Sequence, residues 1–280
     1  MKVVRTVSEA RAEAQRARLE GKSIGFFPTL GAMHEGHMTL VRRSCSECDF
    51  AAVSIFLNPT QFGENEDLDK YPRTMEADLQ KCRDAGVDLV FAPPPSEMYP
   101  EGFDCGVEVG GPTNILEGKL RPGHFRGVAT VCTKLFNILD PDRAYFARKD
   151  YQQLLVIEKL VCDLNLRVRI VRCDTVREPD GLAMSSRNTY LDQKQRQAAL
   201  VLSRSLQEAR KAYGSGERNA RAIQAAVENL IKHEPLAVID YVEVRDAETL
   251  HAVGMIENPA VVLLAVKIGA TRLIDNVVLE

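Results

Sequence analysis

Short apolar segments alternate with amphipathic segments over the first 175 residues of the chain. Runs such as 51–57 (AAVSIFL) and 88–92 (DLVFA) have the length of a strand. They are almost continuously apolar, which is typical of strands that are buried on both faces. The segments between them have the periodicity of helices. This rhythm predicts right-handed βαβ units and a parallel sheet with helices on both faces, which is a Rossmann-like α/β fold.

The boundaries of the predicted elements follow from the residues beside them. Thr6 followed by Glu9 forms a capping box, and Gly21 marks the end of the first helix. Later strands end at glycine, proline or polar turns. We predict strands at 24–28, 51–57, 88–92, 144–147 and 167–173, and helices at 36–48, 74–85, 128–139 and 151–163.

The pattern changes after about Thr175. A polar loop, REPDGLAMSSRN, leads to two predicted helices at 193–212 and 220–233. The chain then becomes rich in β-forming residues, at 240–246 and 261–280. Helices followed by strands that can pair as hairpins predict a smaller α+β domain. We therefore expect a first domain of residues 1–175 and a second of residues 176–280.

Composition excludes several classes of protein. The 36 basic and 39 acidic residues give a net charge of -3, which argues against a general nucleic-acid binder. No run reaches the roughly 18 apolar residues of a membrane span, and the N-terminal segment lacks the apolar core of a secretory signal. Seven cysteines in such a chain are expected to be reduced thiols, so we predict a cytoplasmic protein.

The stretch 28–37, PTLGAMHEGH, follows the first predicted strand and opens a helix. Parallel α/β sheets bind ligands at this position, and the free N–H groups of a helix start attract phosphate. His34 and His37 would project from the same side of the first turn and donate hydrogen bonds to phosphate oxygens. The stretch is neither a GxGxxG turn nor a P-loop, and its histidines are too close for HExxH. It therefore predicts a nucleotide site of another kind.

Four further stretches carry polar groups that could serve the same site. Each follows a predicted strand, precedes a predicted helix or lies in the loop between the domains, so all can converge on one cleft. The stretch with two arginines and a histidine predicts an anion contact. The four are NPTQF at 58–62, RPGHFRGV at 121–128, KDYQQ at 149–153 and MSSRN at 184–188.

Together the five stretches resemble the pantoate–β-alanine ligase (pantothenate synthetase) family, and the similarity covers essentially the whole chain. PTLGAMHEGH is similar to the HIGH motif, and MSSRN to the KMSKS loop, of class I aminoacyl-tRNA synthetases and nucleotidylyltransferases. The resemblance implies ATP-dependent condensation of (R)-pantoate with β-alanine through an enzyme-bound pantoyl adenylate. The products would be pantothenate, AMP and pyrophosphate. It also implies Mg²⁺, a C-terminal lid domain and a homodimer.

The resemblance also implies roles for particular residues, with no metal ligand assigned. The catalytic residues would be His34, His37 (as proton donor), Lys149 and Arg187. Gln61 and Gln153 would bind pantoate, and Gln61 would also bind β-alanine. Asn58, Tyr71, Arg121 and His124 would be further pocket members. The ATP site would comprise Leu30, Gly31, Ala32, Met33, His34, Glu35, Gly36, His37, Ala147, Arg148, Lys149, Asp150, Val176, Met184, Ser185, Ser186 and Arg187.

One position departs from the family pattern. Ala147 and Arg148 stand where the family has glycine and an acidic or amide residue. If position 147 required a positive φ, the methyl group would cost on the order of 1 kcal/mol and weaken ATP binding. Two other functions stay open: a HIGH-type nucleotidylyltransferase that stops at the nucleotidyl product, and a non-catalytic nucleotide-binding relative. The amide-rich stretches argue against the first. A tRNA synthetase would need an anticodon-binding domain that is not visible.

Overall fold

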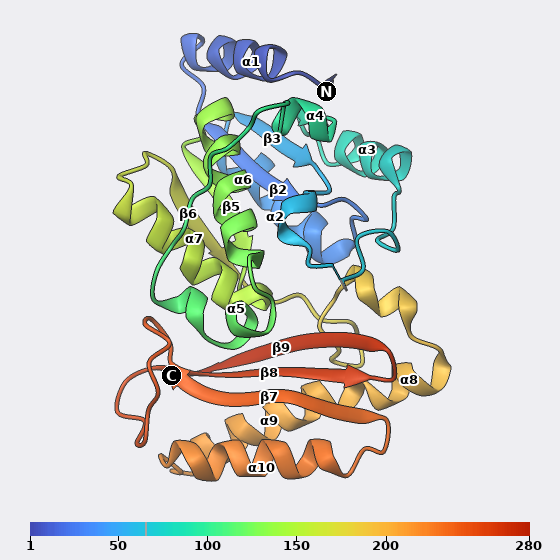
Figure 1. Cartoon of the computed structure of the whole chain (residues 1–280), viewed down its shortest axis with the longest axis vertical. Helices are drawn as coiled ribbons and strands as arrows, with labels where there is room; N and C mark the ends of the chain where they lie inside the picture. The colour runs from blue at the N-terminus through green and yellow to red at the C-terminus, as the bar shows by residue number, and fades with distance from the viewer. Residues whose placement is uncertain (65) are drawn as a thin grey trace. The chain divides into compact units, whose positions relative to one another are not determined.

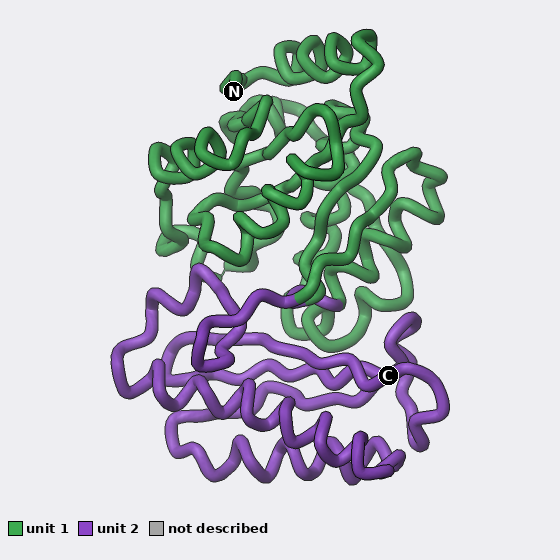
Figure 2. The backbone as a smooth tube through the Cα atoms, turned by 180° about the vertical axis from the view of Figure 1, so that it is seen from behind, with its two compact units in different colours: residues 1–148, 152–174 green, residues 149–151, 175–280 purple. Residues whose placement is uncertain are grey.

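The computed structural model describes residues 1–64 and 66–280, which form two compact units (Figures 1 and 2). The first unit comprises residues 1–148 and 152–174. The second comprises residues 149–151 and 175–280. In the described part of the chain, no helix has the length and apolar character needed to cross a membrane. The seven cysteines are free thiols.

The first unit is built on a six-stranded sheet in which every neighbouring pair is parallel. The spatial order is β1-β4-β3-β2-β5-β6, so the direction of winding reverses between β2 and β5. The pairing of β2 with β5 covers only Gly25 and Phe26, whereas β2 pairs with β3 over six residues. A crevice at such a reversal is where open α/β sheets bind ligands. The strands are β1 (Lys2–Val4), β2 (Ile24–Thr29), β3 (Phe50–Ile55), β4 (Leu89–Phe91), β5 (Arg143–Ala147) and β6 (Arg169–Cys173).

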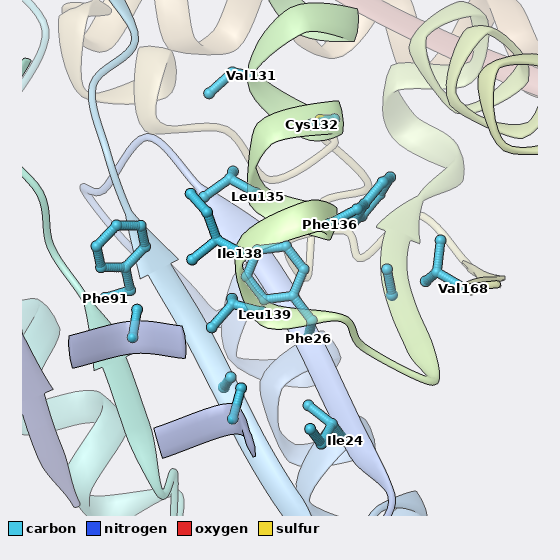
Figure 3. Close-up of a cluster of buried hydrophobic side chains, with 14 of the residues drawn as sticks. Ile24, Phe26, Phe91, Val131, Cys132, Leu135, Phe136, Ile138, Leu139 and Val168 are labelled. Atoms are coloured by element: carbon cyan, nitrogen blue, oxygen red, sulfur yellow. The ribbon is translucent and has the colours of Figure 1, made fainter. Parts of the chain in front are cut away.

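Helices cover both faces of this sheet, as the sequence predicted. On one face, α1 (Val7–Leu19), α6 (His124–Leu139) and α7 (Tyr151–Asp163) share a core with Phe26 and Phe91. Figure 3 shows side chains of α6, among them Leu135 and Leu139, beside these two rings. On the other face, α2 (Glu35–Glu47) and α3 (Met75–Asp84) share a second core with Phe27 and Val90. Neighbouring residues of one strand thus enter different cores, which is why the strands read as continuous apolar runs.

The differences from the predicted elements are local. The capping box of Thr6 and Glu9 is confirmed. β1 was missed, because a three-residue edge strand carries too little pattern. α6 begins at His124 rather than Val128, since Gly123 turns the chain with a φ of 82° and the first helical turn is buried. The short elements of this part are η1 (Pro59–Gln61), α4 (Pro95–Met98), η2 (Pro112–Asn114), α5 (Leu116–Leu120) and η3 (Arg148–Asp150).

The second unit pairs β7 (Ala237–Asp246), β8 (Ala260–Ile268) and β9 (Thr271–Leu279) in one antiparallel sheet. Two helices, α9 (Leu200–Gly214) and α10 (Ala220–Lys232), pack on this sheet and share its apolar core (Figure 1). The helix predicted at 193–212 is divided, because Leu202 donates its N–H to the carbonyl of Ala199, a tighter three-residue turn. The remaining elements are η4 (Ser186–Tyr190) and α8 (Gln193–Ala198). The parallel sheet and the smaller antiparallel sheet confirm the predicted fold class.

Candidate active site

The loop after β2 reverses the chain and starts α2 at the carboxyl edge of the sheet. Two consecutive residues in it have positive φ: 98° at Gly31 and 50° at Ala32. Glycine adopts this conformation without strain, whereas alanine rarely does. His34 then occupies the N-cap position of α2. The N–H groups of the first helical turn and the positive end of the helix dipole are therefore directed to the ligand-binding edge.

Two side chains of α3 hold this loop from behind, and sequence reasoning missed both. The carboxylate of Asp78 accepts hydrogen bonds from the N–H groups of Ala32 (2.9 Å) and Met33 (2.8 Å). It also accepts one from the hydroxyl of Thr74, at 3.0 Å. The ammonium group of Lys81 donates to the carbonyl of Met33. An acidic residue in the first turn of a helix usually indicates only a favourable helix dipole, so the sequence carried no distinct signal of this contact.

The rings of His34 and His37 lie stacked, with centroids 3.9 Å apart and planes inclined by 21°. The spacing in the sequence had predicted that they share one side of the first turn. The backbone N–H of His34 donates to Nδ1 of His37 at 3.4 Å. Because Nδ1 accepts, the proton of a neutral His37 ring is carried by Nε2. The Phe27 ring, 5.7 Å from the His37 ring, limits its orientation further. His37 is thus arranged as a hydrogen-bond donor through Nε2.

A buried amide pair follows β3. Asn58 is the N-cap of the 3₁₀ turn η1 and Gln61 is its last residue, and both side chains are buried. Oδ1 of Asn58 accepts from the hydroxyls of Tyr99 (2.7 Å) and Thr60 (2.9 Å). Its Nδ2 therefore faces Oε1 of Gln61, at 3.1 Å, and the carbonyl of Gly127, at 3.2 Å. This network orients Gln61 so that its Nε2 group is the donor end for a further partner.

His124 supports the same turn and is neutral. One ring nitrogen, Nδ1, lies 2.8 Å from the backbone carbonyl of Gln61 and must carry the proton. Nε2 then accepts from Arg121, at 3.1 Å. Burial, reinforced by the charge of Arg121, lowers the pKa of His124 to about 4. Arg121 itself forms a bidentate ion pair with Glu66, in which both N–O distances are 2.6 Å.

His124 therefore carries no charge near neutral pH, and the anion contact predicted for the RPGHFRGV stretch stays a prediction. The charge of Arg121 is matched by Glu66. His124 holds the backbone carbonyl of Gln61, and Arg121 contacts His124. Tyr71 is buried, with its ring in edge contact with Phe62 at 6.1 Å.

The two glutamines of KDYQQ have different environments. Gln152 is buried, and its Nε2 donates to the carbonyls of Pro112 (2.6 Å) and Ile115 (2.8 Å). Its Oε1 accepts from the N–H of Glu117 at 3.0 Å. Gln152 is thus committed to holding the segment around α5. Gln153, the residue proposed to bind pantoate, is only partly buried on α7.

The unusual Ala147 is an ordinary strand residue. It ends β5 opposite Cys173 and packs partly buried against the second core. Among the described residues other than glycine, positive φ values occur at Ala32, Leu116, Asp140, Asn165 and Leu250. The conformational penalty considered for position 147 therefore does not arise. The guanidinium group of Arg148 lies 3.6 Å from the carboxylate of Asp174, a long and exposed contact.

In the second unit, residues 149–151 are fastened at two points. The amide of Asn276 donates to the carbonyl of Lys149 at 2.8 Å, and the hydroxyl of Tyr151 donates to the carbonyl of Ala247 at 2.9 Å. The Lys149 side chain is 17% exposed, and its ammonium group lies 3.4 Å from Asp150. A largely buried lysine whose backbone is fixed in this way is suited to contact a bound anion.

The MSSRN loop of the second unit has an ordered base. Met184 donates its N–H to the carbonyl of Val176 at 3.0 Å. Ser185 caps η4 by accepting the N–H of Arg187 at 3.3 Å. Asn188 donates to Glu178 at 2.9 Å, so the asparagine is structural. Ser186 and Arg187 follow the cap within η4 and are partly buried. The loop therefore presents two hydroxyl groups and a guanidinium group from a defined turn.

Comparison with known proteins decides the family. A sequence model described as pantoate-beta-alanine ligase matches residues 2–278. The chain belongs to this family. A pantothenate synthetase of Pelotomaculum thermopropionicum is 54% identical, with 100% of this chain and 99% of the relative covered. One of Acetivibrio thermocellus is 52% identical, with both chains fully covered.

Solved structures of the family agree. The crystal structure of pantothenate synthetase from Thermus thermophilus has a TM-score of 0.94 and 45% identity, with 99% of each chain covered. A pantoate-beta-alanine ligase from Francisella tularensis, complexed with beta-gamma ATP and beta-alanine, has a TM-score of 0.82 and 33% identity. It covers 99% of this chain, and 97% of that chain is covered. As a member of this pantoate–β-alanine ligase family, the chain is an ATP-dependent ligase that joins pantoate to β-alanine by an amide bond.

Proposed function

We propose that ligation proceeds in two steps at the carboxyl edge of the parallel sheet. In the first, a carboxylate oxygen of pantoate attacks the α-phosphorus of ATP, and the bond to the β-phosphate oxygen breaks to release pyrophosphate. In the second, the amine of β-alanine attacks the acyl carbon and loses a proton. The bond from that carbon to the phosphate oxygen breaks, which gives pantothenate and AMP. The stacked His34 and His37 at the start of α2 are the observation that carries this proposal.

The first step builds negative charge on phosphate oxygens, and fixed donors directed at that charge lower the barrier. His37 donates through Nε2, the nitrogen that carries the proton when Nδ1 accepts from the backbone. His34 and the first-turn N–H groups of α2 bind the phosphates beside it. Lys149 and Arg187 neutralise the developing charge, and Ser185 and Ser186 add hydroxyl donors. No covalent bond to the enzyme is required, since positioning supplies most of the catalysis.

The remaining members of the proposed ATP site follow the same two loops and the end of β5. Leu30, Gly31, Ala32, Met33, Glu35 and Gly36 surround the two histidines. Ala147, Arg148 and Asp150 flank Lys149, while Val176 and Met184 belong to the base of the MSSRN loop.

Neutral amides are suited to hold pantoate, because its carboxylate must stay nucleophilic. A cation in direct contact would stabilise the carboxylate and lower its reactivity, whereas an amide N–H orients it at a smaller cost. Gln61 has its Oε1 occupied by Asn58, so its Nε2 faces the substrate in this assignment. Gln153 provides a second amide from α7. The Francisella ligase is complexed with beta-gamma ATP and beta-alanine, which supports a site that holds the nucleotide and the amine substrate together.

Mg²⁺ would neutralise charge on the triphosphate. Within residues 1–64 and 66–280, no group of three or more histidine, cysteine, aspartate or glutamate side chains is arranged as a metal site. We expect the cation to enter with ATP, because Mg²⁺ commonly takes most of its ligands from phosphates and water. We further propose that residues 176–280 act as a lid over a domain of residues 1–175, and that the enzyme is a cytoplasmic homodimer, as the family resemblance implies.

The products test this function. With ATP, Mg²⁺, pantoate and β-alanine, we expect AMP and pantothenate in equal amounts. When β-alanine is left out, we expect a single turnover that releases pyrophosphate. Pantoate labelled with ¹⁸O in its carboxylate should transfer one labelled oxygen to AMP, because the bridging oxygen stays on phosphorus. A stable nucleotide adduct that β-alanine does not consume would indicate a nucleotidylyltransferase. Binding of ATP without any turnover would indicate a non-catalytic relative.

The role of His37 has its own test. Replacing His37 by alanine should slow pyrophosphate release by roughly two to three orders of magnitude, the effect of losing one donor to developing charge. The exposed His251 provides a matched control, and His251→Ala should retain full activity. Unchanged single-turnover kinetics in His37→Ala would remove this residue from the mechanism.

A further inference from the structure

Two side chains of α3 bind the backbone of the loop that carries the two histidines, one as an acceptor of N–H groups and one as a donor to a carbonyl. Asp78 accepts the N–H groups of two successive residues, Ala32 and Met33, while Lys81, one helical turn later, donates to the carbonyl of Met33. These contacts join parts of the chain 45 to 48 residues apart. The proposed chemistry uses neither side chain of α3.

Burying the carboxylate of Asp78 costs free energy, which indicates a role beyond packing. Asp78 is 1% exposed, and its hydrogen-bond donors are the two backbone N–H groups and the Thr74 hydroxyl. A carboxylate is expensive to bury, and accepting strong hydrogen bonds is what compensates it. The same bonds hold Ala32 at a φ of 50°, where L-residues are rare. Strained backbone of this kind persists only where its surroundings impose it, and it concentrates at functional sites.

We propose that Asp78, assisted by Lys81, is a positioning residue for adenylation. It holds the left-handed turn at Ala32, so that His34 and His37 enter α2 in the geometry that receives the triphosphate. The inference rests on the proposed function of these histidines. Gly31 fits the same design, since its φ of 98° is a conformation that residues with a side chain rarely adopt.

The first test is Asp78→Asn. The amide has the shape of the carboxylate, but its NH₂ group faces one of two N–H donors, so one bond becomes a repulsion. We expect the rate of pyrophosphate release to fall about 10- to 100-fold, as displacement of a reacting group by about an ångström does. The KM for β-alanine should stay within about twofold, because the second step does not depend on this geometry to the same degree. Glu76→Gln, the same change on an exposed residue of α3, is the matched control and should retain full activity.

A second pair of variants separates positioning from stability. Adding Ala32→Gly to Asp78→Asn should recover at least about threefold of the lost rate, because glycine adopts the left-handed turn without strain. A loss caused by a weakened fold would instead follow the melting temperatures of the two variants. Lys81→Met removes the other contact at an exposed side chain, and it should lower the rate about two- to fivefold with an unchanged melting temperature.

These experiments distinguish failure of the positioning role of Asp78 from failure of the proposed function of the histidines. Full activity in Asp78→Asn, or a loss that follows the melting temperature and is not recovered by Ala32→Gly, would overturn the positioning role. If His37→Ala retains its activity, the proposed function of the histidines fails instead. Amide hydrogen exchange at Ala32 and Met33 gives a readout independent of activity. Their protection should be lost in Asp78→Asn, and retained protection would also overturn the inference.

Discussion

Gly127 lies in α6 where the helix meets the turn that carries Gln61. A Cβ built on it would be 2.4 Å from the carbonyl oxygen of Thr60 and 2.7 Å from Cα of Gln61. Real Cβ atoms essentially never approach closer than 3.0 Å, so the Thr60 carbonyl would have to move by at least 0.6 Å. Both obstacles are backbone atoms, which cannot rotate away. Gly127→Ala must therefore shift η1, and Gln61 with it.

One stabilising and two destabilising contributions set the effect on the free energy of unfolding. Alanine is better than glycine inside a helix by about 0.8–1 kcal/mol. Overpacking costs about 1–3 kcal/mol, and weakening the bond from Asn58 to the Gly127 carbonyl adds about 1 kcal/mol. The net loss of unfolding free energy should be about 1–3 kcal/mol. Because Gln61 is proposed to bind pantoate, a shift of this size should reduce kcat/KM for pantoate about 10- to 100-fold.

Urea unfolding and initial rates of pantothenate formation measure these two effects. Gly214→Ala is the matched control, because Gly214 also lies in a helix but nothing is within 4 Å of a Cβ there. It should be neutral or slightly stabilising and fully active. If Gly127→Ala has the activity of the control, Gln61 is not positioned by this contact and the reasoning is refuted.

Two further predictions concern His124 and Ala147. Because burial lowers the pKa of His124 to about 4, the unfolded chain binds a proton between about pH 6.5 and 4 that the folded chain does not, so stability falls as pH falls through this range. His124→Asn should remove up to about 3 kcal/mol of this fall, measured by urea unfolding at pH 7 and 4.5, and equal slopes in both proteins would contradict the assignment. Ala147→Gly should leave the KM for ATP within about twofold and destabilise the protein by roughly 0.5–1 kcal/mol. A several-fold lower KM would show that the methyl group does crowd the nucleotide.

Local patterns in the sequence were enough for the regular elements. Segment 51–57 was identified as a strand because a residue run buried on both faces must be apolar throughout. The capping box of Thr6 and Glu9 could be predicted because its partners are three residues apart. β1 escaped prediction, since three residues at an edge strand have no period to detect. The start of α6 was misplaced because a buried, neutral histidine reads as polar in the sequence.

The sequence also determined which residue types stand at the carboxyl ends of the strands, and with them the family and its chemistry. The tertiary structure alone decided how those residues are held. In the sequence, Asp78 is an ordinary acidic residue of a first helical turn. In the structure, it binds the backbone of Met33, 45 residues away along the chain. His124 reads as a cationic contact, but burial makes it neutral and turns it toward the backbone of Gln61. The physical reason is that charge state and buried hydrogen bonding depend on neighbours brought together by folding, whereas periodicity and capping depend on neighbours along the chain.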